Sequence, residues 1–229
     1  MANLLIEKTG KVAVVTVNRP EQMNSINSKT RLELANAFTD LGKDSGISVI
    51  ILTGAPGKAF IAGADIKEFL KRDMSSQEVL EKDWIVTKII SNLSKPVIVM
   101  IDGFCLGGGL EIAMACDLRI ASDRSKLGQP EINLGIIPGA GGTQRLTRLI
   151  GEGRAMEMIL TGRMITAEEA CNYGIINFIY SAEELETKTM EIANTIADKS
   201  PYAIERAKKS IKAVSHMNLE EGLKLEREM

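Results

Sequence analysis

Two glutamates, Glu111 and Glu131, have the settings in this sequence that best suit acid–base chemistry. Glu111 comes just after three consecutive glycines, and Glu131 lies between the run Gly128-Gln129-Pro130 and an apolar stretch. Burial raises the pKa of a carboxyl group, and a second carboxylate nearby raises one pKa of the pair further. Such a pair can act as a general acid and a general base near neutral pH.

Glycine-rich segments accompany both glutamates, and a third segment of the same kind precedes them. The three segments are Ala59 to Lys67 (AFIAGADIK), Gly103 to Asp117 (GFCLGGGLEIAMACD) and Gly128 to Arg145 (GQPEINLGIIPGAGGTQR). Glycine permits unusual backbone angles and lets a ligand approach main-chain N–H groups closely. Free amides at a helix start also carry the positive end of the helix dipole. The segments are therefore candidate sites for an anion or a developing oxyanion.

Each of these features also has an interpretation that involves no chemistry. The glycines at 107–109 can simply allow a tight turn from a strand into a helix. Glu111, in the first turn of that helix, can compensate the helix dipole, and Glu131 can be an exposed loop residue. The functional interpretation differs from these because it requires the three segments to share one site.

Other kinds of site are not supported by the sequence. The run Gly139 to Arg145 lacks the Gly-Lys-Ser/Thr ending of a phosphate loop. No GxGxxG follows a strand with an acidic residue about 20 positions later, so nicotinamide cofactors are not expected. Metal ligands do not cluster. The single histidine, His216, lies near the C-terminus on a predicted helix, which argues against a Ser-His-Asp or Cys-His hydrolase. We expect no metal and no cofactor.

Composition predicts a soluble globular protein. The chain has 229 residues, 45% hydrophobic and 25% charged, and a net charge of −2 that provides no basic field for nucleic acid. No apolar run approaches the roughly 20 residues that cross a bilayer, so we expect no membrane partner and a cytoplasmic location. The cysteines Cys105, Cys116 and Cys171 lie in apolar stretches and are expected to be reduced core residues.

The elements that must position the glutamates follow from hydrophobic periodicity. Apolar runs predict strands within residues 1–11 and at 11–18, 49–53, 96–101 and 117–121. Apolar residues at helical spacing predict helices at 28–41, with Ser28 as the N-cap, and at 78–93, with Trp84 and Ile85 facing the core. Strands that alternate with helices in this way imply crossover connections and an α/β protein.

The later part of the sequence has a different character. Further helices are expected at 107–114, from 139–142 onward, and at 167–172, 183–199, 201–214 and 218–229. After Gly162 strand candidates are few, so the last third is expected to be a helical layer. A domain boundary is placed near residue 200.

Four segments in this order resemble the crotonase superfamily, and most closely its enoyl-CoA hydratases. They are VNRPEQMNSIN at Val17 to Asn27, AGADI at Ala62 to Ile66, LGGGLEIAMACD at Leu106 to Asp117, and GQPEINLGIIPGAGGTQRL at Gly128 to Leu146. One such segment is weak evidence, whereas four in register are highly specific. The resemblance covers the chain from Leu5 to about Ser215.

The resemblance implies an α/β fold of the crotonase (ClpP-like) type, a spiral of ββα turns around a CoA thioester with a C-terminal helical region. On this basis residues 1–200 form the spiral core with the thioester site. Residues 201–229 are the start of a helical region that mediates homotrimers, commonly paired into hexamers. The family's usual C-terminus extends beyond Met229, so this region is expected to be truncated.

The resemblance also implies an activity and roles for residues. An enoyl-CoA hydratase is a hydro-lyase that reversibly adds water, in a syn manner, to a 2-enoyl-CoA and yields a 3-hydroxyacyl-CoA, with CoA as part of the substrate. The backbone amides of Ala64 and Gly108 match the oxyanion hole. Glu111 would activate the water that attacks C3, and Glu131 would deliver a proton to C2.

Further residues match the family's CoA-binding positions, and one departs from its pattern. Those matched to the path of the pantetheine and adenine, largely through backbone contacts, are Met23, Ser25, Ala62, Asp65 and Ile66. Leu110 stands where many hydratases have cysteine and is expected to reshape the pocket wall.

Two alternative functions remain open at this point. An enoyl-CoA isomerase or another crotonase-fold lyase would use one principal acid–base carboxylate, and the presence of both glutamates argues against it. A non-catalytic scaffold or RNA-binding homologue would keep only the fold, because fold does not imply function. The sequence pI of about 5.7 disfavours RNA binding.

Overall fold

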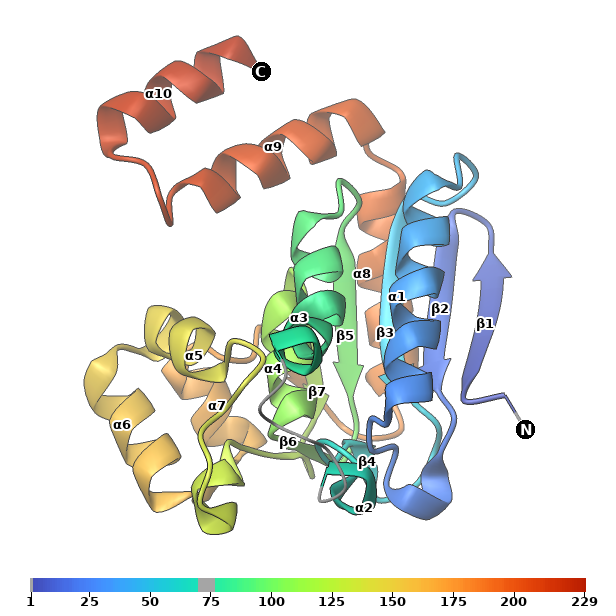
Figure 1. Ribbon diagram of the computed structural model, residues 1–229. Helices are drawn as coiled ribbons and strands as arrows, with labels where there is room; N and C mark the ends of the chain where they lie inside the picture. Colours follow the sequence, from blue (N-terminus) through green and yellow to red (C-terminus); the bar gives the residue numbers. More distant parts are fainter. Residues whose placement is uncertain (1, 70–76) are drawn as a thin grey trace.

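A computed structural model describes residues 2–69 and 77–229, with the side chains of residues 69 and 77–84 outside the description. Its strands form two sheets (Figure 1). The larger sheet contains, in spatial order, β1 (Leu4–Thr9), β2 (Val12–Val17), β3 (Val49–Gly54), β5 (Val97–Ile101), β7 (Leu118–Ser122) and β10 (Phe178–Tyr180). The smaller sheet contains β4 (Ala59–Ile61), β6 (Phe104–Leu106), β8 (Lys126–Gly128) and β9 (Met164–Thr166).

The two sheets are joined by one repeated unit. Three times in succession, a strand of the larger sheet is followed by a strand of the smaller sheet and then by helical residues. The helical parts include α2 (Ile66–Phe69) and α3 (Gln77–Asn92) after β4, α4 (Gly108–Ala115) after β6, and the 3-10 helix η2 (Pro130–Leu134) with α5 (Gly142–Ile150) after β8. This is the ββα spiral that the sequence resemblance implied.

The central strands of the larger sheet are buried on both faces. Helices α1 (Ser28–Lys43) and α3 lie over one face, and α8 (Leu185–Ala197) lies over the other (Figure 1). Alternate side chains of β3 point to opposite faces of the sheet. Ile50 and Leu52 belong to the main core cluster, whereas Val49 and Ile51 pack with residues of α8. Parallel strands covered on both sides consist of continuous apolar runs, and that is the pattern from which they were predicted.

The predicted strands and helices of the first half are confirmed to within a few residues, with two local corrections. Helix α1 is capped by Asn27, whose side chain accepts a hydrogen bond from Thr30 N at 2.8 Å, so Ser28 is the first helical residue and not the N-cap. In α3, Ile85 is 38% exposed, and Val86 and Ile90 face the core instead. The expectation for Trp84 concerns a side chain outside the described set.

The last third contains strands as well as helices, contrary to expectation. β10 pairs in parallel with β7, and β9 pairs antiparallel with β8. Each has only three residues, which is too short to produce a detectable period. The helices are α6 (Glu152–Thr161), α7 (Ala167–Tyr173), α8, α9 (Pro201–Ala213) and α10 (Leu219–Glu228). Helix α8 covers the larger sheet, whereas α9 and α10 follow it and extend beyond the sheets (Figure 1).

None of the helices in the described residues is both long and apolar enough to cross a membrane.

Candidate active site

Three strand ends bring the glycine-rich segments together. β4, β6 and β8 run parallel to one another, so their carboxyl ends lie at the same edge of the smaller sheet. The loops that follow these ends carry Ala64, Gly107 and Glu131 respectively. A hydrogen bond from Gly107 N to Gly128 O, 2.9 Å long, joins two of the loops directly. The three segments therefore lie together, as the functional interpretation requires.

The three consecutive glycines have three different environments. Gly107 caps α4 with a φ of +51°, a conformation that L residues rarely adopt. A Cβ on Gly109 would lie 2.2 Å from the carbonyl oxygen of Ile61, so this position lets α4 pack closely against β4. A Cβ on Gly108 would lie 3.8 Å from Ala64 N and 4.0 Å from Glu111 Oε2. The packing interpretation thus applies to Gly109, while Gly108 borders the site.

Glu111 is a buried carboxylate with strong main-chain donors. Its side chain lies on α4, the residue is 3% exposed, and Oε1 accepts hydrogen bonds of 2.7 Å from both Ala140 N and Gly142 N. Gly142 is the first residue of α5, so the carboxylate also lies at the positive end of that helix. Donors of this kind stabilise the ionised form of a carboxyl group. The GAGG run, which lacks the residues of a phosphate loop, thus binds a carboxylate of the protein itself.

Glu131 differs from Glu111 in its surroundings. It lies in η2 and is partly buried, and burial is the largest influence that raises its pKa to about 7. A backbone hydrogen bond lowers this pKa, and the charge of Glu111 raises it. A Cβ on Gly107 would lie 3.0 Å from Glu131 Oε1, so the carboxylate reaches the glycine turn beside α4. The site therefore contains one carboxylate that accepts two main-chain hydrogen bonds and one carboxyl group whose pKa is raised to about 7.

Gln129 supports Glu131 and was not singled out from the sequence. It is fully buried, and with its amide nitrogen turned toward Glu131 it donates to Oε1 at 2.8 Å and to Oε2 at 3.0 Å. In this orientation, both the oxygen and the nitrogen of the Gln129 amide face suitable hydrogen-bonding partners. A buried amide needs partners, but nothing in the sequence indicates that this glutamine is buried, so its role could not be read from residue type.

The two glutamates and the two amides open onto one cavity of about 1280 Å³. Ala64, Gly108, Glu111 and Glu131 all line it. No hydrogen bond among the described residues uses the N–H of Ala64 or Gly108, so both can serve a ligand. The volume exceeds the roughly 300–1,000 Å³ typical of small-molecule pockets.

Of the residues expected along the CoA path, only some line this cavity. Ala62 and Ile66 do, whereas Met23, Ser25 and Asp65 lie in adjoining loops and do not. Leu110, which was expected to reshape the pocket wall, is fully buried in the core and does not line the cavity, because it lies on the opposite side of α4 from the site.

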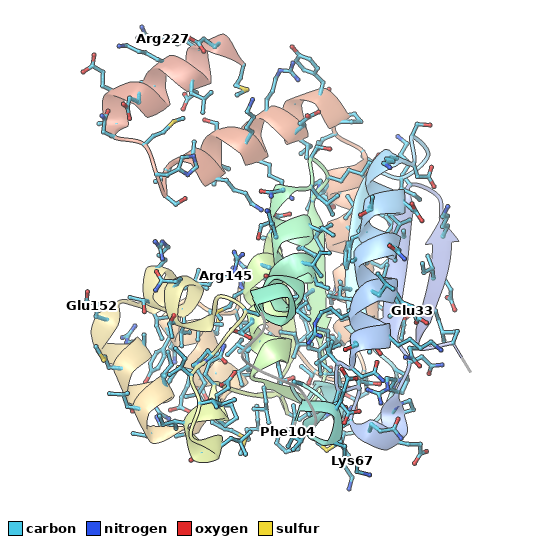
Figure 2. The ribbon with its side chains drawn as sticks, viewed as in Figure 1. Glu33, Lys67, Phe104, Arg145, Glu152 and Arg227 are labelled. Atoms are coloured by element: carbon cyan, nitrogen blue, oxygen red, sulfur yellow. The ribbon has the colours of Figure 1, made fainter. Side chains whose placement is uncertain are left out.

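Arg145 was not assigned any role from the sequence. It lines the cavity from α5, on the side of that helix toward α3 and α4 (Figure 2). Its Nε atom is buried and has no hydrogen-bond partner among the described residues. Burial lowers the pKa of its guanidinium, while nearby Cys116 and Glu111 raise it.

The remaining reactive side chains lie elsewhere. Cys105 and Cys116 are buried and free, Cys171 is partly buried, and burial raises the pKa of the Cys116 thiol to about 12. These are the core cysteines that were expected. His216 is exposed and lies in the turn after α9, not on a helix. Within the described residues no group of three or more His, Cys, Asp or Glu side chains is placed to hold a metal ion.

Comparison with known proteins gives consistent similarities over nearly the whole chain. The family model described as enoyl-CoA hydratase/isomerase matches residues 7–229. A short-chain-enoyl-CoA hydratase of Clostridium acetobutylicum is 43% identical over 229 residues, covering 99% of this chain and 87% of the relative. A crotonyl-CoA hydratase of Syntrophomonas wolfei is 39% identical over 227 residues, covering 98% and 86%.

Solved structures agree with the sequence relatives. The crystal structure of an enoyl-CoA hydratase from Bacillus anthracis superimposes with a TM-score of 0.96 at 41% identity, covering 99% of this chain and 89% of the other. An enoyl-CoA hydratase from Thermoplasma volcanium gives a TM-score of 0.92 at 33% identity, covering 98% and 89%.

Proposed function

This chain belongs to the enoyl-CoA hydratase/isomerase family, and from that premise we propose that it is an enoyl-CoA hydratase. The reaction is the reversible addition of water to a 2-enoyl-CoA, which gives a 3-hydroxyacyl-CoA. The observation that carries the proposal is the unequal pair of carboxyl groups in one cavity. Glu111 accepts two amide hydrogen bonds, and the pKa of Glu131 is raised to about 7. One residue is thus suited to accept a proton and the other to donate one.

The proposed steps assign each group one task. The thioester carbonyl oxygen accepts hydrogen bonds from Ala64 N and Gly108 N, which stabilise the enolate as it forms. Ionised Glu111 takes a proton from water while the water oxygen bonds to C3, and protonated Glu131 gives its proton to C2. After this step Glu111 carries the proton taken from water and Glu131 is ionised. Transfer of that proton from Glu111 to Glu131 restores the starting protonation state. One oxyanion donor contributes about 3 kcal/mol of transition-state stabilisation.

The test is hydration of crotonyl-CoA, followed by the loss of absorbance of the conjugated thioester. We expect Glu111→Gln and Glu131→Gln each to lower kcat by at least about 100-fold, because general acid–base catalysis contributes about 10²–10⁴-fold. Circular dichroism of both variants should match the unsubstituted protein. A double Gln variant that still hydrates at the normal rate contradicts the mechanism.

Isomerisation is the alternative within the family. The same protein incubated with a 3-enoyl-CoA distinguishes the two, because an isomerase needs no added water and one carboxyl group can carry the proton between carbons. The paired glutamates support hydration as the main reaction. A protein that binds the thioester without converting either substrate would indicate the non-catalytic scaffold.

Assembly and location are also proposed. Exposed apolar side chains on and next to α9 and α10, among them Ile211, Val214 and Leu219 at 71–80% exposure, support a homotrimer or a hexamer built from two trimers. Light scattering should then give three or six times the 24.9 kDa mass of one chain. Location in the cytoplasm stays a prediction from the sequence.

A further inference from the structure

The loop that carries Ala64 is bound along its length to the segment Arg19–Ile26, here called the strap. Ala62 N donates to Met23 O at 3.1 Å, and Ile26 pairs with the residues on both sides of Ala64, at 2.9 and 3.0 Å. In a parallel bridge of this kind, the N–H of the residue opposite points away from its partner strand. The Ala64 N–H therefore points away from the strap and toward the cavity.

The strap has an uncommon backbone conformation. Met23 and Asn24 have φ values of 51° and 55°, and they are the non-glycine residues with positive φ among those that the structure describes. Such conformations persist only when the surroundings hold them. The buried side chain of Asn24 does so: it accepts from Arg19 N at 2.9 Å and donates to Ala55 O at 3.0 Å and Ala59 O at 2.8 Å. The strap is thereby attached to the start of β4, which leads to Ala64.

An ion pair links the strap to the other end of the Ala64 loop. Arg19 Nη2 donates to Asp65 Oδ2 at 2.9 Å, and Arg19 Nη1 donates to Ser25 O. The two side chains are only 11% and 17% exposed. Asp65 also accepts from Lys67 N at 3.2 Å, at the start of α2. Because Asp65 is bonded directly to Ala64, a displacement of its backbone would displace Ala64 and its N–H as well.

We propose that Arg19 and Asp65 are positioning residues for the reaction, and that their ion pair fixes the direction of the Ala64 N–H without touching the substrate. The inference rests on the proposed function, which gives that N–H its task. Donors must be held to within about 0.5 Å and 10–20° of the productive geometry. A misplacement of about 1 Å can lower a rate about 100-fold, and loss of a donor lowers kcat about 10²–10³-fold.

The ion pair of Arg19 and Asp65 is less exposed than an ordinary ion pair on the surface. Arg124 and Asp102 form such a pair, with Nε 2.7 Å from Oδ1, and their side chains are 60% and 32% exposed. Neither residue lines the cavity. Exposed pairs contribute little. Arg124→Met is therefore a matched control, since it also removes an arginine and leaves an aspartate.

The experiment compares Arg19→Met, Arg19→Lys, Asp65→Asn and Arg124→Met with the unsubstituted protein. We expect Arg19→Met to lower kcat for crotonyl-CoA by about 10–100-fold while KM changes less than about threefold. Lysine can reach Asp65 but cannot also bind Ser25 O in the same fork, so Arg19→Lys should restore part of the rate. Asp65→Asn keeps the shape of the side chain and should lower kcat in the same way. Arg124→Met should not.

A second measurement separates this inference from the proposed function. Butyryl-CoA labelled with ¹³C at its carbonyl cannot be hydrated, and its infrared carbonyl band moves to lower frequency when the oxygen accepts strong hydrogen bonds. We expect that shift to be smaller in Arg19→Met and Asp65→Asn than in Arg124→Met. Equal shifts and equal kcat in all variants would overturn the inference. If the unsubstituted protein does not hydrate crotonyl-CoA, the proposed function is wrong. The carbonyl band of bound butyryl-CoA still tests whether the ion pair of Arg19 and Asp65 fixes the direction of the Ala64 N–H. If Arg19→Met does not fold, Asp65→Asn decides.

Discussion

Glu111 and Glu131 are the same residue type and differ only in what surrounds them. Glu111 accepts two main-chain N–H groups at 2.7 Å, and Glu131 is raised to a pKa of about 7 chiefly by burial. Pairs of carboxyl groups whose environments push their pKa values apart are a general sign of acid and base roles. In the proposed mechanism, the active form of the site is therefore the pair that carries one proton.

The pH dependence of the rate follows from that proton. Above pH of about 7 Glu131 loses it, so kcat/KM should fall about tenfold for each further pH unit. Hydration neither releases nor takes up a proton, so its equilibrium constant is independent of pH. The kcat/KM values for hydration and dehydration must therefore follow the same curve, which is measured with crotonyl-CoA and 3-hydroxybutyryl-CoA. A flat profile from pH 6 to 9 would contradict this assignment.

Gln129 allows a second test of the pH profile of kcat/KM. Its amide donates to both oxygens of Glu131, which favours the ionised carboxylate. Gln129→Met removes the donors at similar length, so the pKa of Glu131 should rise and the falling limb should move to higher pH. A limb that stays in place would mean that Gln129 does not act on Glu131.

At the scale of elements, the contact between α4 and β4 limits how closely the N–H groups of Ala64 and Gly108, the proposed oxyanion donors, can approach each other. Gly109 lies against Ile61 of β4, and the chain continues from β4 to Ala64. Any side chain at residue 109 must push these elements apart. The proposed catalytic geometry therefore depends on Gly109, whose role is to allow close packing.

Two alanine substitutions in helices test this contact. A Cβ on Gly109 would lie 2.2 Å from Ile61 O, so Gly109→Ala should lower the free energy of unfolding by about 1–3 kcal/mol or more and also lower kcat. Gly153 in α6 has no atom within 4 Å of such a Cβ, so Gly153→Ala should raise it by about 0.5–1 kcal/mol. Urea denaturation measures both, and equal effects would show that the close approach does not matter.

At the scale of the whole molecule, one aspartate attaches α9 to the sheet. Asp117 lies just before β7, and its carboxylate pairs with Lys208 at 2.6 Å and Lys212 at 3.0 Å. It also accepts a hydrogen bond from Val97 N at 2.8 Å. The side chain of Lys208 is only 9% exposed, and burial lowers its pKa despite the aspartate. Removing one partner of a buried pair leaves an uncompensated charge.

The expected consequence is a loosened C-terminal region. Asp117→Asn keeps one acceptor oxygen for Val97 N but removes the charge and the second acceptor oxygen, so α9 should detach more often. Hydrogen exchange of peptides from 201–213 should speed up by about 10²–10³-fold or more, since breaking a buried pair costs about 3–5 kcal/mol. The double variant Asp117→Asn with Lys208→Met should recover part of the protection. Unchanged exchange in the single variant would show that α9 is held by other contacts.

The sequence alone determined much of the fold and the identity of the carboxylate pair. Strands such as β3 and β5 are apolar because both of their faces are covered, and that pattern is local and visible. The four motifs in order indicated the family, and they contained Glu111 and Glu131. The short strands β4, β6, β8, β9 and β10 were not predicted from the hydrophobic pattern, because three residues show no period.

Only the tertiary structure decided which partners each side chain has. Ala140 and Gly142 reach Glu111 across 29 and 31 residues of sequence, and Arg19 reaches Asp65 across 46. Main-chain N–H groups occur at every non-proline residue, so no residue type identifies the ones that face a carboxylate. Folding alone brings these groups within hydrogen-bond distance. For that physical reason the sequence indicated a carboxyl pair suited to acid–base chemistry, but not the partners that distinguish Glu111 from Glu131.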